Sequence, residues 1–234
     1  MVNSPNAGVS LTILRALPIF EMLDDEDLKP LTRVAMLRSI PRHTVVLHAG
    51  DQTDAIYFVL SGALKVQISD EEGREVILSM LGPGELFGEM GALDDHPRSA
   101  TVLAVEASQV VVIGKADFKQ CLMENPDVSL FIMRNLTRRL RLADRNIESL
   151  ALLDVYGRVA RLLLEAAELV DGRKVVTHKL SKQDIAKMIG ASREMVSRVM
   201  RDLTAQGLIQ ERDGQLILVD LDAFKRHGDG AAAN

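Results

Sequence analysis

Residues 181–203, SKQDIAKMIGASREMVSRVMRDL, decide the fold of the C-terminal third of the chain. Ser181 stands where a side chain can cap a short helix, and Gly190 supplies the sharp turn that ends it. Ser192 is placed to cap a second helix. The apolar positions expected to face inward are Ile185, Met188 and Ile189 in the first helix and Val196, Val199, Met200 and Leu203 in the second. Two short helices at this spacing predict a helix-turn-helix.

The outward face of the second helix carries residue types that can read DNA bases. Three charged residues occupy its N-terminal part: Arg193, Glu194 and Arg198. Arginine can donate two hydrogen bonds to guanine, and glutamate can accept one from the cytosine amino group. Residues near the two helix N-termini suit contacts to DNA phosphates: Ser181, Lys182, Gln183 and Ser192. Two alternatives remain, since helix-turn-helix patterns also occur inside enzymes and the charged residues can form a solvated, mutually paired face.

Composition is that of an ordinary water-soluble chain. Its 234 residues are 47% apolar and 26% charged, which is enough for one large or two modest domains. The formal charge of −5 comes from residues 1–153, whereas residues 154–234 hold 13 basic against 12 acidic residues. No apolar stretch approaches the roughly 18 residues of a membrane span, and the N-terminal residues lack the basic segment and following apolar core that are typical of a signal sequence. We therefore expect a cytoplasmic protein without a membrane partner.

Metal sites and catalytic groups are not expected. Cys121 is the only cysteine and has no partner at metal-ligand spacing, so we expect a packed helix residue rather than a metal ligand or redox sensor. No nucleophile, base and orienting group occur at a recognisable spacing. The histidines are scattered over the chain: His43, His48, His96, His178 and His227. The sequence therefore predicts a protein that is not an enzyme, with no catalytic residue.

The N-terminal half combines helices with many short strands. Residues 9–39 have apolar positions three and four residues apart, which predicts helices. Between Thr44 and Ile113, short β-branched runs alternate with glycine-containing turns. The expected strands are residues 45–47, 56–60, 64–68, 76–80, 101–105 and 110–113. Short strands at even spacing predict an antiparallel barrel or jelly roll.

A long helix is expected over residues 127–153, opened by Asn125-Pro126-Asp127. Its apolar positions follow a heptad pattern: Met133, Leu136, Leu140, Ala143, Ile147 and Leu150. Because charged residues border this narrow stripe, we expect a parallel homodimer, with packing against the chain's own barrel as the alternative. Residues 154–234 are predicted to be mainly helical and to end in a hairpin over residues 208–219 and a polar tail over residues 228–234.

Residues 191–198, ASREMVSR, resemble the recognition-helix signature of the catabolite activator, or cyclic AMP receptor protein (Crp/Fnr), family of bacterial transcription regulators. The similarity continues through residues 125–127 and 153–158 and covers nearly the whole chain. It implies an α+β fold: a cyclic-nucleotide-binding β-barrel or jelly roll over residues 1–125, a dimerisation helix over 126–153 and a winged helix-turn-helix over 154–234.

The same resemblance implies partners and a target sequence. Arg193, Glu194 and Arg198 match the three base-reading positions of the family's cyclic AMP receptor branch. It implies a TGTGA-like half-site in a palindromic operator, read by a homodimer on double-stranded DNA. RNA polymerase is a further implied partner, although residues 170–179 depart from the loop found in family activators.

Residues 84–100, GELFGEMGALDDHPRSA, resemble the phosphate-binding cassette of cyclic-nucleotide domains. Gly88 allows a close backbone approach, Glu89 can accept a hydrogen bond from a ribose hydroxyl, and Arg98 with Ser99 can hold an anionic phosphate. The resemblance implies further residues at this pocket: Val66, Leu78, Ser79, Met90 and Arg139. The expected ligand is a cyclic nucleotide, and no metal is expected.

The base of that nucleotide is less well defined. Where cyclic AMP receptors carry threonine and serine, this chain has Ala143 and Asp144. Asp144 can accept from the adenine amino group but suits the adjacent N1 and N2 donors of guanine better. Alternatively it pairs with Arg141 or Arg145 and contacts no base. Family frequency favours cyclic AMP, and residue chemistry favours cyclic GMP or cyclic di-GMP.

Two rival interpretations come from other classes. A cyclic-nucleotide-gated regulatory module of another effector would not bind DNA; it explains residues 40–120 but leaves residues 181–203 without a role. Iron–sulfur and haem sensors are rivals among regulators, but Cys121 alone cannot hold a cluster and no axial pair is evident.

Overall fold

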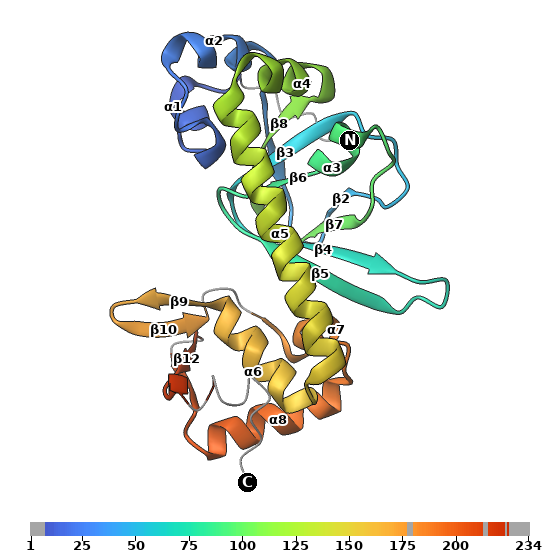
Figure 1. Ribbon diagram of the computed structural model, residues 1–234, viewed down its shortest axis with the longest axis vertical. Coiled ribbons are helices and arrows are strands. Elements are labelled where there is room, and N and C mark those ends of the chain that lie inside the picture. Colours follow the sequence, from blue (N-terminus) through green and yellow to red (C-terminus); the bar gives the residue numbers. More distant parts are fainter. Residues whose placement is uncertain (1–7, 177–179, 213–214, 223, 225–234) are drawn as a thin grey trace. The chain divides into compact units, whose positions relative to one another are not determined.

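The computed structural model describes residues 8–176, 180–212, 215–222 and 224. The chain divides into two compact units, Met1–Arg138 and Arg139–Asn234, and each is described by itself (Figure 1). The long helix α5 (Pro126–Leu152) contributes residues to both units. The described residues do not include His178, His227, the expected tail over residues 228–234, or Asp213 and Gly214 of the expected hairpin. Among the described residues no helix is long and apolar enough to span a membrane.

Three short helices open the first unit: α1 (Leu11–Arg15), the 3-10 helix η1 (Pro18–Phe20) and α2 (Asp25–Val34). Asp24 caps α2, because its carboxylate accepts hydrogen bonds from the Glu26 and Asp27 amides. The expectation of helix up to residue 39 is wrong. Residues Met36–Ile40 instead form strand β1, which pairs antiparallel with strand β8 (Ser108–Gly114). The hydrogen bonds between these strands override the helical spacing of the apolar residues.

Two four-stranded antiparallel sheets form the body of this unit. The first, in the order β1-β8-β3-β6, contains β3 (Ala55–Ser61), β6 (Leu86–Phe87) and β8 (Ser108–Gly114). The second, in the order β2-β7-β4-β5, contains β2 (Val45–Leu47), β4 (Leu64–Ser69), β5 (Glu75–Leu81) and β7 (Thr101–Ala104). The described strands therefore form a jelly-roll sandwich; the predicted jelly roll is confirmed, and the barrel is not closed.

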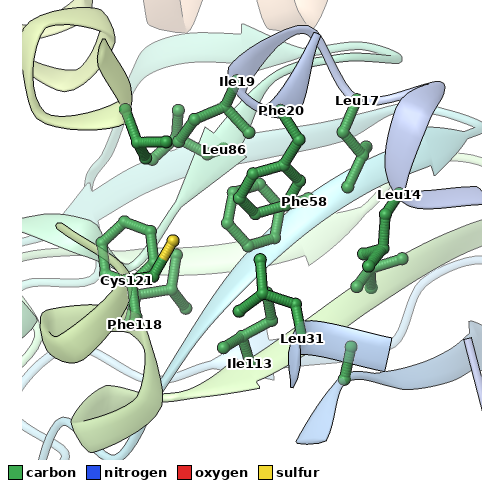
Figure 2. Close-up of a cluster of buried hydrophobic side chains, with 14 of the residues drawn as sticks. Leu14, Leu17, Ile19, Phe20, Leu31, Phe58, Leu86, Ile113, Phe118 and Cys121 are labelled. Atoms are coloured by element: carbon green, nitrogen blue, oxygen red, sulfur yellow. The ribbon is translucent and has the colours of Figure 1, made fainter. Parts of the chain in front are cut away.

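Apolar cores lie on both faces of the first sheet. Inward-facing residues of the two sheets, including Val59, Leu64 and Val112, form one core. The opposite face packs against α1, α2, α4 (Lys115–Glu124) and the start of α5. There the Phe58 ring lies 5.5 Å from that of Phe20 and 6.1 Å from that of Phe118 (Figure 2).

Cys121 of α4 belongs to this second core. Burial raises the pKa of its thiol to about 11, so the reactive thiolate is disfavoured at neutral pH. The structure thus agrees with a packed helix residue.

The second unit contains α6 (Val155–Ala166), β9 (Ala167–Val170), β10 (Arg173–Val176), α7 (Lys182–Ile189), α8 (Arg193–Ala205), β11 (Ile209–Arg212) and β12 (Gln215–Leu218). Its strands form one antiparallel sheet in the order β11-β12-β10-β9. The sequence predicted the β11–β12 pair but missed β9 and β10. Their signal was the Asp171-Gly172 dipeptide, whose two residues adopt the positive φ values of a tight hairpin turn.

Candidate functional site

The guanidinium group of Arg98 is buried inside the first unit. The residue is only 5% exposed, and its Nη1 and Nη2 atoms donate 2.8 Å hydrogen bonds to the carbonyl oxygens of Gly88 and Ala55. Asp54 Oδ1 lies 3.4 Å from Nη2, although the Asp54 side chain is 85% exposed. The Tyr57 ring centroid is 5.8 Å from the guanidinium carbon, within cation–π range. The charge of Arg98 is thus held mainly by neutral oxygens.

One donor of this buried group has no acceptor. Arg98 Nε is buried and makes no hydrogen bond in the described part of the chain. A buried donor without an acceptor is costly, and an anionic oxygen would satisfy both the donor and the charge. Arg98 therefore fits a phosphate ligand, as the cassette resemblance implies.

Gly88 makes the close packing around Arg98 possible. It has φ of +81° and lies immediately before α3 (Glu89–Asp94). A Cβ atom at this position would lie 2.5 Å from Arg98 Nη1, so a larger residue would displace the guanidinium group. Glu89 is buried in the first turn of α3, whereas Met90 is half exposed.

The strand residues expected at the pocket differ in their settings. Val66 of β4 pairs with Ser79 of β5, and both are half-buried. A β-bulge follows, where Gln67 pairs with Ile77 and leaves Leu78 as the extra, half-exposed residue. The structure therefore brings Val66 and Ser79 side by side and turns Leu78 toward solvent; Ser99 is likewise exposed.

The long-helix residues expected near the ligand belong to the second unit. Ala143 and Asp144 are exposed and Arg139 is half-buried. Among the described residues, Asp144 forms no ion pair with Arg141 or Arg145. Its side chain is thus exposed to solvent.

The heptad stripe of α5 is largely exposed. Leu140 and Ile147, seven residues apart, are 63% and 65% exposed, and Met133 and Leu150 are also exposed. Leu136 differs, because it packs against the core of the first unit. Most of the expected seam is therefore uncovered in a single chain.

A polar network joins the end of α5 to α6 within the second unit. Arg161 of α6 donates a 3.0 Å hydrogen bond to Ser149 and lies 3.4 Å from the Glu148 carboxylate. Burial raises the pKa of the nearby Glu165 carboxyl group, while Arg145 and Arg161 oppose that rise. Sequence reasoning missed this network, because its members meet only through the crossing of two helices.

The helix-turn-helix has the local geometry that its sequence predicts. Ser181 and Asp184 form a capping box at the start of α7, and Gly190 ends the helix in the left-handed conformation. Ser192 Oγ accepts a 3.2 Å hydrogen bond from the Met195 amide and caps α8. The inward face of α8 is buried at Val196, Val199 and Leu203. This part of the interpretation is confirmed.

The expected base-reading side chains remain accessible. Arg193, Glu194 and Arg198 are exposed, and within the described ranges no ion pair joins them. The structure therefore does not show the alternative, in which these three charged residues pair with one another. The expected phosphate contacts also lie exposed at the starts of α7 and α8: Ser181, Lys182, Gln183 and Ser192. No group of three or more described His, Cys, Asp or Glu side chains is arranged to hold a metal ion.

Two protein families match successive parts of the chain. A cyclic nucleotide-binding domain matches residues 37–125, and a Crp-like helix-turn-helix domain matches residues 157–227. Their combination makes the chain a ligand-responsive DNA-binding regulator. An isolated cyclic-nucleotide module of another effector would leave the second match unexplained.

Curated relatives extend the similarity over most of the chain. The cAMP-activated global transcriptional regulator CRP of Haemophilus influenzae is 35% identical over 190 residues, which cover 78% of this chain and 83% of the relative. The CRP-like cAMP-activated global transcriptional regulator of Mycobacterium tuberculosis is 30% identical over 92% of this chain and 97% of the relative. Among solved structures, the c-di-GMP responsive global regulator CLP of Xanthomonas campestris aligns with a TM-score of 0.70 at 26% identity, covering 84% of this chain and all of that one. The chain belongs to the Crp/Fnr family of transcription regulators, which are not enzymes.

Proposed function

We propose that the protein is a homodimer whose affinity for a TGTGA-like palindromic operator is set by a cyclic nucleotide bound at Arg98. The observation that carries the ligand proposal is the buried guanidinium group of Arg98 with its unsatisfied Nε donor. A nucleotide phosphate supplies the missing acceptor, and Ser99 and Glu89 take the phosphate and a ribose hydroxyl. We assign residues 1–125 to ligand binding, 126–153 to dimerisation and 154–234 to DNA binding.

The proposed ligand is cyclic AMP, with cyclic di-GMP or cyclic GMP as the alternative. The Haemophilus and Mycobacterium relatives are named as cAMP-activated, whereas the Xanthomonas neighbour is named as c-di-GMP responsive. Residue chemistry supports the alternative, because Asp144 offers two acceptor oxygens to the adjacent guanine donors. The pocket side chains Val66, Leu78, Ser79 and Met90, with Arg139 and Ala143, complete the proposed site.

Dimerisation through α5 is supported by its uncovered apolar stripe. Leu140 and Ile147 repeat at the heptad spacing that pairs parallel helices. A two-fold dimer presents two copies of α8 and matches a palindromic operator.

RNA polymerase is the further partner that we propose. Because the proposed target is chromosomal DNA, we place the protein in the cytoplasm.

Removal of Arg98 is expected to abolish nucleotide binding whichever base is used. In Arg98→Ala the phosphate loses its charge-assisted hydrogen bonds, so affinity should fall at least about 100-fold, or roughly 2.7 kcal/mol. Arg98→Lys keeps the charge but lacks Nε and should also bind weakly. Calorimetric titration with cyclic AMP, cyclic GMP and cyclic di-GMP measures the loss. Arg74→Ala, which removes an exposed arginine between β4 and β5, is the control. Undiminished nucleotide binding by Arg98→Ala would show that Arg98 does not hold the ligand phosphate.

The identity of the base is tested at Asp144. If guanine is read there, Asp144→Ala should lose about tenfold in affinity for cyclic GMP or cyclic di-GMP, or roughly 1.4 kcal/mol. Cyclic AMP binding should then change little. If adenine is the base, wild-type protein should already prefer cyclic AMP in the same calorimetric series. Equal loss of all three nucleotides would contradict a selective role for Asp144.

The dimer is tested by placing a charge in the α5 stripe. Leu140→Asp buries an unpaired carboxylate in the seam and should convert the dimer to monomer at micromolar concentration. Sedimentation equilibrium reports the mass. Leu152→Asp is a matched control, because Leu152 is also largely exposed (74%, against 63% for Leu140) but lies off the stripe. A wild-type monomer at micromolar concentration would rule out the proposed dimer.

Competition binding to two duplexes distinguishes residues of α8 that read bases from residues that contact phosphates. Arg193→Ala and Arg198→Ala should each lose about 1 to 3 kcal/mol of discrimination between a TGTGA palindrome and a scrambled duplex. Lys182→Ala should weaken both duplexes alike, because phosphates carry no sequence information. Fluorescence anisotropy with both duplexes gives the ratio. An unchanged ratio in both arginine variants would mean that α8 does not read bases through them.

A further inference from the structure

Met195 is an exposed apolar residue in the first turn of α8. It is 45% exposed, whereas Val196 beside it is fully buried. Its amide donates to Ser192 Oγ, which fixes its place three residues beyond the helix cap. Met188 and Met200 pack against the core of this unit, but Met195 is not among the described side chains that do so. Packing therefore does not account for a large apolar residue at this position.

The neighbours of Met195 on the helix surface are the proposed base readers. Arg198 lies three residues further along, so the two side chains are adjacent on one side of the helix. Glu194 precedes Met195 in the same turn and is also exposed. The N-terminal turns of a recognition helix are the part that contacts base edges in the major groove. Met195 thus flanks the charged readers at the end of α8 that faces DNA.

Because the Met195 side chain is apolar, we expect it to contact an apolar group of a base in the major groove. Guanine, cytosine and adenine present hydrogen-bonding groups to the major groove, and thymine alone adds a methyl group. An unbranched methionine side chain has the length and flexibility to contact such a methyl group. We propose that Met195 is a further specificity-determining residue of α8, which contacts a thymine methyl group beside the base pair held by Arg198. This inference rests on the proposed function of α8 as the DNA reader.

The test removes the methyl group from DNA and leaves the hydrogen-bonding groups in place. Binding sites are first selected from random duplexes with wild-type protein, in separate pools without nucleotide and with cyclic AMP, cyclic GMP or cyclic di-GMP. Each thymine of the selected half-site is then replaced by uracil, one position at a time. At one position we expect affinity to fall about fourfold, the loss equivalent to one methyl group leaving an apolar contact.

Variants at residue 195 show whether the lost contact belongs to Met195. Met195→Gln has a similar length but a polar end, and Met195→Ala removes most of the side chain; both should bind the thymine and uracil duplexes equally at that position. Met195→Leu should retain the preference for thymine. Met123→Ala, which removes an exposed methionine from α4, should keep wild-type sensitivity to uracil. Circular dichroism melting verifies that the variants are folded, and a merely structural role would not change the thymine-to-uracil ratio.

The outcomes separate this inference from the function on which it rests. If wild-type protein selects a palindrome but tolerates uracil at every position, or if the half-site contains no thymine, Met195 does not read a methyl group. Full sensitivity to uracil in Met195→Ala and Met195→Gln would also overturn the inference. If no duplex is selected from any pool, the proposed function of α8 fails instead.

Discussion

Burial of the Arg98 guanidinium group against the Gly88 and Ala55 carbonyl oxygens is the constraint on which the proposed ligand site depends. A buried charge loses several kcal/mol of hydration, and neutral carbonyls return only part of that free energy. Asp54 adds little, because exposed ion pairs are screened by water. A bound phosphate would supply both the missing charge and the acceptor for Nε. We therefore expect ligand binding to raise the stability of the unit, as any ligand specific for the folded state does.

The second unit contains both the C-terminal part of α5 and the helix-turn-helix. Arg161 ties the end of α5 to α6 through Ser149. Helix α6 in turn shares a core with α7 and α8. A ligand that changed the conformation of α5 by binding Asp144 would thus act on the unit that carries the proposed base-reading residues of α8. Such coupling requires that the ligand bind with different affinity to two arrangements of α5.

Local signals explain why the helix-turn-helix followed from the sequence and other features did not. Ser181 and Ser192 cap helices by accepting hydrogen bonds from amides three residues further along, and Gly190 ends α7 through its own conformation. Such local interactions can be predicted from the sequence. Strand β1 escaped prediction because its pairing with β8 joins segments about 70 residues apart. The acceptors of Arg98 are backbone carbonyls, which any residue supplies and no residue type marks. The cassette was therefore found through its resemblance, whereas the burial of Arg98 and its unsatisfied Nε donor became visible only in the fold.

The residues that we propose to determine specificity, for the nucleotide base and for DNA, are exposed, and each lies on an element that buried residues hold in place. Arg98, which we propose to hold the phosphate that all cyclic nucleotides share, is fixed by packing, whereas Asp144, which we propose to read the base, is exposed. On α8, Val196 and Leu203 are buried and hold the helix in place, while the residues that we propose to read bases are exposed. Exposed positions can change with little effect on folding, because substitutions there create neither cavities nor buried unpaired groups. Ligand base and operator sequence can therefore differ between proteins that share this fold, and each is best sought at the exposed residues beside a buried anchor.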